Sequence, residues 1–193
     1  MIISGAYFNV DLLLKNTDST IPNAEALGVG SQLNNGIAKY EPEVLIKCFS
    51  YSLYKEFMSQ FENYVIKESA EQKWKDLLTG KDYQINDKDY SWRGLIFEEA
   101  GVKKSLIANY VFHNCIARGN TNIGIQKEKS AQEMQTIKTL YINSWNDFVE
   151  MTTISNNGLV SLYQFINDMN EINSNTYQNF NPTAFKKMNQ FSI

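Results

Sequence analysis

The residue types that most often do chemistry in proteins are scarce in this sequence. Its single histidine, His113, lies between Phe112 and Asn114 in an apolar stretch. A histidine that acts as a base or a metal ligand needs partners, and Cys115, two residues further along a helix, points to a different face. No serine has the sequence context of a nucleophile. The pattern therefore favours a core or interface histidine and gives no zinc site.

Two glycine-containing segments match phosphate-binding motifs only in part. The sequence GVG at 28–30 begins like a dinucleotide fingerprint, but position 33 is Leu and no buried strand precedes it. In GVKKS at 101–105 the lysine does not follow the glycine at the spacing of a P-loop, so the backbone cradle of that motif cannot form. We therefore expect no cofactor.

One acidic pair has the residue types of a metal-dependent nuclease. Glu98 and Glu99 could hold magnesium while Lys103 orients the attacking water. We expect residues 95–118 to be helical, however, and on a helix Glu99 and Lys103 form an i, i+4 ion pair of the kind common on solvated faces. The sequence thus predicts a protein that is not an enzyme, with a small nuclease or terminase accessory as a minor alternative.

The composition is that of a folded protein without a basic face for nucleic acid. Of 193 residues, 43% are hydrophobic and 13% aromatic, which is enough to build a core. The 18 basic and 21 acidic residues give a net charge of −3, which argues against sequence-specific DNA binding. Cys48 and Cys115 lie in apolar patterns typical of buried thiols in a reducing compartment. We expect neither a signal peptide nor a membrane span.

Apolar spacing predicts a mainly α fold, a helical bundle of four to five helices. A proline in the first turn places the start of the first helix at residues 40–42, and Asn86-Asp87 favours a small hairpin-like insertion within 81–94. Glycine or asparagine is expected to end most of the helices. The expected helices cover about 40–61, 69–79, 95–118, 131–153 and 159–169.

The two ends of the sequence lack this periodicity, so the expected organisation has three parts. Residues 1–40, rich in Gly and Asn, are predicted to form an N-terminal arm with a short element at 7–14 and a long loop. Residues 41–171 are the helical core domain. Residues 172–193 are an Asn-rich C-terminal tail, because Asn disfavours helix interiors.

Aromatic and arginine side chains outside the expected core stripes are candidates for an interface. Trp and Arg are enriched at binding hot spots, although Trp92 could equally anchor the hairpin on the helices. The tail also carries aromatics, which gain stability only on a surface, either of their own domain or of a neighbour. The candidate interface residues are Tyr83, Tyr90, Trp92, Arg93, Phe180 and Phe185.

Five short segments, taken in their order and spacing, resemble a known family. They are LLTG at 77–80, DY at 82–83, WRGL at 92–95, KSLIANYVF at 104–112 and YINSWN at 141–146. Within about positions 40 to 171, this pattern resembles the head-to-tail connector proteins, also called ring or adaptor proteins, of crAss-like tailed bacteriophages.

The resemblance implies a structural virion protein without catalytic activity. Such a protein forms a homo-oligomeric ring of about twelve copies between the portal and the tail, and genomic DNA passes through without sequence readout. Its partners would be copies of itself, the portal and a neighbouring ring or tail protein, with no membrane. It would be found at the head-tail junction of the virion, and in the host cytoplasm before assembly. A phage regulatory or assembly-factor binding module is the alternative.

A cyclic ring also places a physical demand on each subunit. Its contacts are heterologous, so one patch meets a different patch on the next copy, and each subunit needs two distinct adhesive surfaces. Residues 15–40 and 81–94 are the segments that we expect to supply them.

Overall fold

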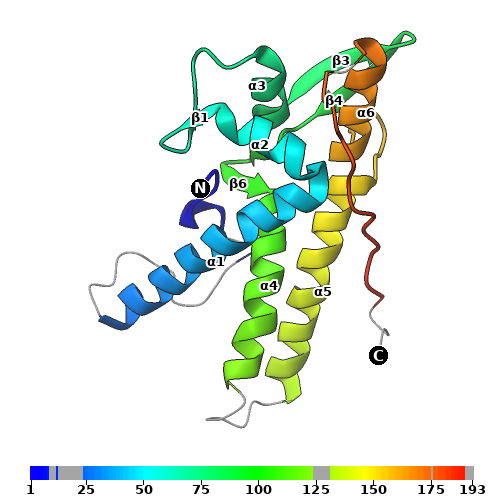
Figure 1. Ribbon diagram of the computed structural model, residues 1–193. Coiled ribbons are helices and arrows are strands. Elements are labelled where there is room, and N and C mark those ends of the chain that lie inside the picture. The colour runs from blue at the N-terminus through cyan, green and yellow to red at the C-terminus, as the bar shows by residue number, and fades with distance from the viewer. Residues whose placement is uncertain (9–11, 13–23, 124–130, 175, 190–193) are drawn as a thin grey trace.

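The computed structural model describes residues 1–8, 12, 24–123, 131–174 and 176–189 (Figure 1). This part of the chain holds six α-helices and three two-stranded antiparallel sheets. The fold is therefore mixed α/β, and the predicted mainly α bundle is wrong. The helices are α1 (Ala24–Phe49), α2 (Tyr51–Ser59), α3 (Gln72–Thr79), α4 (Leu106–Ile123), α5 (Ala131–Thr153) and α6 (Leu162–Ile172), and a 3-10 turn, η1, covers Gly5–Tyr7.

Each sheet is a hairpin of two consecutive strands. The pairs are β1 (Phe61–Glu62) with β2 (Val65–Ile66), β3 (Lys81–Ile85) with β4 (Lys88–Trp92), and β5 (Ile96–Glu99) with β6 (Val102–Ser105). The hairpin expected within 81–94 is present as β3 and β4. Its turn residues Asn86 and Asp87 have φ values of 51° and 60°, the left-handed conformation that a two-residue hairpin turn requires.

The helix predicted over 95–118 is wrong in its first part. Residues 96–105 form β5 and β6, which reverse at Ala100 and Gly101, where φ is 52° and 78°. Helix α4 begins only at Leu106. The hydroxyl of Ser105 donates to Leu95 O at 2.7 Å and accepts from Ile107 N at 3.1 Å, so this buried side chain joins the hairpin to the first turn of α4.

The helix predicted over 40–61 is wrong in two respects: it begins earlier, and it is divided at Ser50, where φ is 131°, into α1 and α2. The proline that predicts a helix start, Pro42, lies inside α1, which begins at Ala24. The predicted loop is therefore wrong over residues 24–40, and residues 13–23 lie outside the described residues. At Gly36 an added Cβ would lie 2.7 Å from the sulfur of Cys115, so the glycine allows α1 to pack closely on α4.

Three predicted helices are confirmed. Helix α5 has the predicted bounds, α3 ends before Gly80 with φ of 101°, and α6 begins after Ser161, whose hydroxyl accepts a hydrogen bond from Gln164 N. Helices α4 and α5 run antiparallel as a two-helix limb, which α1 crosses (Figure 1). The three hairpins, α2 and α3 gather at one end of this limb and form the head of the molecule.

Candidate interaction surfaces

His113 lies in the core of the molecule, where it is only 5% exposed. Its Nδ1 lies 3.0 Å from the backbone oxygen of Tyr141, and its ring stacks on the Tyr141 ring with centroids 3.9 Å apart. Because a carbonyl oxygen only accepts, Nδ1 carries the proton in this contact. Burial lowers the pKa of His113, and the bond to Tyr141 opposes this in part. His113 therefore has a packing role in the core, through its hydrogen bond and ring contact with Tyr141.

The two cysteines are thiols in different surroundings. Cys48 is fully buried, and this burial raises the pKa of its thiol. Cys115 packs against Gly36, as described above. Among the residues whose placement is described, no group of three or more His, Cys, Asp or Glu side chains is arranged to hold a metal ion.

The acidic pair lies on a hairpin instead of a helix, so its predicted i, i+4 geometry is wrong. Glu98 pairs across the strands with Lys103 in the β5–β6 register. The carboxylate of Glu99 accepts from Lys104 Nζ at 2.7 Å and lies 3.3 Å from the Arg93 guanidinium. Lys104 and Arg93 together lower the pKa of Glu99. The pair is exposed, and Glu99 has a structural role between two cations.

Two of the predicted interface residues lie opposite one another on the β3–β4 hairpin. Tyr83 and Tyr90 are register partners, and their rings stack with centroids 5.7 Å apart. The Tyr83 hydroxyl donates to Asp168 of α6 at 2.5 Å. Burial and this carboxylate raise the pKa of Tyr83. Both rings are half-buried, so the hairpin is attached to α6 through one of its faces.

The next pair of predicted interface residues, Trp92 and Arg93, has opposite environments. Trp92 is 3% exposed, donates from Nε1 to Leu77 O at 3.1 Å and stacks on Phe165 at 5.5 Å. Arg93 is exposed, and its guanidinium also lies over the Phe97 ring. In the single chain, therefore, Arg93 is available to a partner, whereas the Trp92 side chain anchors the hairpin in the core.

The C-terminal residues 177–189, here called the strap, run without regular secondary structure alongside α6 and α5 (Figure 1). Their predicted interface residues pack on the chain's own core, Phe180 against Tyr163 at 5.7 Å and Phe185 against Phe148 at 4.9 Å. The strap also donates from its backbone to the end of α1, from Asn181 N and Thr183 N to the carbonyls of Phe49 and Lys47. The tail therefore docks on its own domain.

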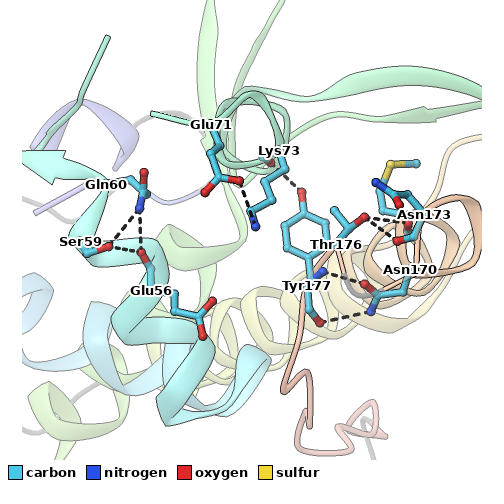
Figure 2. A network of polar contacts seen from close by, with 10 residues as sticks. Glu56, Ser59, Gln60, Glu71, Lys73, Asn170, Asn173, Thr176 and Tyr177 are labelled. Carbon is cyan, nitrogen blue, oxygen red and sulfur yellow. Dashed lines mark hydrogen bonds and ion pairs between the residues drawn. The ribbon is translucent and has the colours of Figure 1, made fainter. Parts of the chain in front are cut away.

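Two asparagines hold the strap by its backbone. Asn170 accepts from Tyr177 N at 2.7 Å and donates to Tyr177 O at 3.3 Å. Asn146 makes the same pair of bonds with Met188, at 2.7 and 3.0 Å. Figure 2 shows the first of these pairs, together with the Tyr177 hydroxyl that donates to Lys73 O of α3 at 2.6 Å. The strap is thereby fixed near both of its ends.

A cavity of about 350 Å³ opens beside the β5–β6 hairpin. Its apolar lining includes Phe97, Met151 and Leu159, and Ile154, which is 38% exposed. Arg93, Lys103 and Lys104 contribute charge on one side, and Asp147 and Glu150 on the other. Cavities of this size with apolar walls and a few polar groups are the usual form of a binding site. Sequence reasoning selected Arg93 for an interface and Lys103 for the nuclease alternative, but it did not bring them together with the α5 residues, because α5 and the hairpin are separate in sequence.

The tip of the β1–β2 hairpin carries the two most exposed large apolar side chains among the described residues. Tyr64 is 64% exposed and Val65 is 69% exposed. Asn63 and Tyr64 form the turn with φ values of 50° and 67°, a conformation that bulky residues rarely adopt. Sequence reasoning missed this tip. The available signal was the polar pair Glu62-Asn63 between aromatic and aliphatic residues, which is a short hairpin pattern.

Comparison with known proteins identifies no relative of this chain. No protein-family model, curated protein or solved structure matches the chain. In the described ranges, no helix combines the length and apolar character needed to cross a membrane.

Proposed function

We propose that this chain is a structural subunit of the head-to-tail connector of a tailed bacteriophage. In this proposal, copies of the chain assemble into a ring between portal and tail, and genomic DNA passes through it. The proposal rests on the resemblance of five sequence segments to the connector proteins of crAss-like phages and on one structural observation. That observation is the exposed apolar tip of the β1–β2 hairpin.

The tip supports an assembly role because it has no stabilising role in the single chain. Tyr64 and Val65 are adjacent, apolar and about two-thirds exposed. Exposed apolar area adds no stability until another surface covers it. A subunit that is covered by neighbours in an assembly explains this exposure.

Two of the segments that carry the resemblance, LLTG and WRGL, lie against each other in the fold. This contact supports considering them together as parts of one structural feature. An added Cβ at Gly80 would lie 2.5 Å from Trp92 O, and one at Gly94 would lie 2.6 Å from Leu78 O. The LLTG and WRGL segments therefore pack backbone against backbone in the head. The YINSWN segment lies on α5 and includes Trp145 and Asn146, which hold the strap.

Quantitative mass spectrometry of purified phage particles tests the proposal. We expect about twelve copies of the chain per particle, counted against the major capsid protein, because the resemblance implies a ring of that size. Absence from the particle would overturn the proposal. A stable one-to-one complex with another phage protein, together with that absence, would instead support the regulatory or assembly-factor alternative.

A further inference from the structure

We infer that the β1–β2 tip of one copy inserts into the cavity beside Arg93 of a second copy. This inference rests on the proposed ring assembly and names the contact by which neighbouring subunits meet. The observations that support it are the geometry of the tip, the form of the cavity, the complementary charges beside both, and their separate places in the fold.

The tip is built as a protruding apolar knob. Its two strands are two residues each, and the turn between them places Tyr64 and Val65 at the end of the hairpin. At the base, Phe61 packs against Phe57 with ring centroids 5.0 Å apart, which fixes the hairpin on α2. A short hairpin on an aromatic anchor is a rigid element, so it can enter a partner's cavity with little loss of conformational entropy.

The cavity offers the matching surface. Phe97, Met151, Ile154 and Leu159 give it apolar walls that a tyrosine ring and a valine side chain can cover. Its polar groups include the Asn109 side chain, which is 6% exposed and, among the described residues, donates to the sulfur of Met151 at 3.6 Å. Sulfur is a weak acceptor, so a phenol hydroxyl that enters the cavity would be a better partner for this amide.

The tip and the cavity each have a charged side chain nearby that forms no ion pair among the described residues. Glu62, the register partner of Val65, is exposed and takes part in no ion pair of the described residues. Of the charged groups around the cavity, Arg93 and Lys104 pair with Glu99, and Glu150 pairs with Lys187. Lys103 makes no ion pair within the described ranges. The carboxylate beside Val65 thus complements Lys103 at the edge of the cavity, and such a pair of charges fixes the register of a contact.

The two surfaces belong to different parts of the chain. No residue between 51 and 91 lines the cavity, so the knob does not fill the cavity of its own chain. A contact of knob and cavity is therefore heterologous: each copy uses its knob on one neighbour and its cavity on the other. Repetition of such a contact closes a ring if the rotation between copies allows it, as the proposed function requires.

The first test measures self-association of the purified full-length chain by sedimentation velocity over a concentration series. We expect the wild-type chain to associate. The double variant Tyr64→Ser/Val65→Ser should raise the dissociation constant by at least about tenfold, as expected when central apolar contacts are removed. The matched control is Tyr51→Ser, because Tyr51 is equally exposed, at 63%, but lies on α2 outside the knob. It should leave the association unchanged.

Charge reversal then identifies the receiving surface. Glu62→Lys and Lys103→Glu should each weaken association about threefold or more, since each places like charges together. The chain that carries both changes should recover wild-type association, because its knob and cavity are again opposite in charge. Circular dichroism and thermal melting verify that each variant is folded.

The outcomes separate this inference from the proposed function. Association of the wild type that persists in the Tyr64→Ser/Val65→Ser variant, or a failure of the reversed pair to recover, overturns the knob-and-cavity contact but leaves the ring proposal in place. A wild-type chain that stays monomeric up to its solubility limit also overturns the contact. The ring proposal itself is decided by the copy number in the particle.

Discussion

The side-chain amide of Asn146 makes two hydrogen bonds to the backbone of Met188, one from Met188 N at 2.7 Å and one to Met188 O at 3.0 Å. The methionine side chain takes no part in either bond. Because both bonds go to the backbone N–H and C=O of one residue, we expect the strap to stay in place when the side chain at position 188 is changed. The asparagine itself cannot vary in the same way.

Replacement of this asparagine should release the distal part of the strap. We expect Asn146→Ala to lower the free energy of unfolding by about 1–3 kcal/mol, because it leaves two backbone groups without their partners. Hydrogen-deuterium exchange at residues 183–189 should rise in the same variant. Asn143→Ala, at an exposed position of the same helix, is the control: it should neither lower the free energy of unfolding nor raise the exchange of the strap. Equal exchange in the two variants would contradict a role for Asn146 in docking the strap.

Alanine substitutions at two glycines with left-handed backbone allow the cost of steric overlap to be compared with the cost of backbone strain alone. Gly94 and Gly101 have φ of 99° and 78°, but an added Cβ meets Leu78 O at 2.6 Å only at Gly94, and nothing within 4 Å at Gly101. We expect Gly101→Ala to destabilise the fold by about 1 kcal/mol through strain, and Gly94→Ala by clearly more. Urea denaturation measures both. Similar losses in the two variants would show that the close approach of the two backbones at Gly94 is not required.

The single histidine allows a direct measurement of its burial. We expect the proton NMR titration of His113 in the folded chain to give a pKa below the ordinary value of 6.5, because burial disfavours the imidazolium. The unfolded chain then binds a proton more readily than the folded chain. The contribution of His113 to stability is thus complete above pH 6.5 and is lost as the pH falls through the lowered pKa. The same titration in urea is the reference, and equal values in both states would contradict the buried placement.

A buried carboxylate near the N-terminal segment should affect stability in the opposite pH direction. Glu41 is 4% exposed and accepts from Ile2 N and Ile3 N at 2.8 and 3.0 Å. Burial raises its pKa, although these two bonds oppose the shift. The folded chain therefore holds this proton more tightly than the unfolded chain, and stability is lost as the pH rises from 4.5 through the raised pKa.

The neutral analogue isolates this effect. Glu41→Gln keeps an acceptor oxygen for both amide groups and removes the charge. We expect its advantage in free energy of unfolding over wild type to grow between pH 4 and pH 7, and urea denaturation across this range measures it. Glu56→Gln, at an exposed position of α2, is the control. A pH-independent difference between wild type and Glu41→Gln would show that the pKa of Glu41 is not raised.

The parts of the fold that the sequence predicts well are those with strong local signals. Helix α5 keeps one apolar stripe along its length, and the β3–β4 turn has residues that accept left-handed backbone. The predicted start of α1 is wrong because a proline inside a helix has the same local signal as one in its first turn. Gly36 is predicted to lie in a loop, but it lies in α1. A glycine is needed there because the helix packs closely on Cys115, about eighty residues away in the sequence.

The candidate surfaces were predicted less well, for a physical reason. An aromatic side chain has the same sequence signal whether it packs inside, as Trp92 does, or is exposed on a surface, as Tyr64 is. The error over 95–105 is of the same kind, since a run of apolar and charged residues suits either a helix or a short hairpin. The left-handed turn at Ala100 and Gly101 is what distinguishes the hairpin from a helix here. Alanine rarely adopts this conformation, so the sequence does not indicate the turn.

The strap also has a consequence for the order in which the chain folds. It is synthesised after every helix that it contacts, so α1, α3, α5 and α6 are made before the segment that covers them. Until then the rings of Trp145 and Phe148 lack their Phe185 neighbour, and Trp74 lacks Tyr177. The chain therefore exposes aromatic surface until the strap docks, and docking of the strap is the step that covers it.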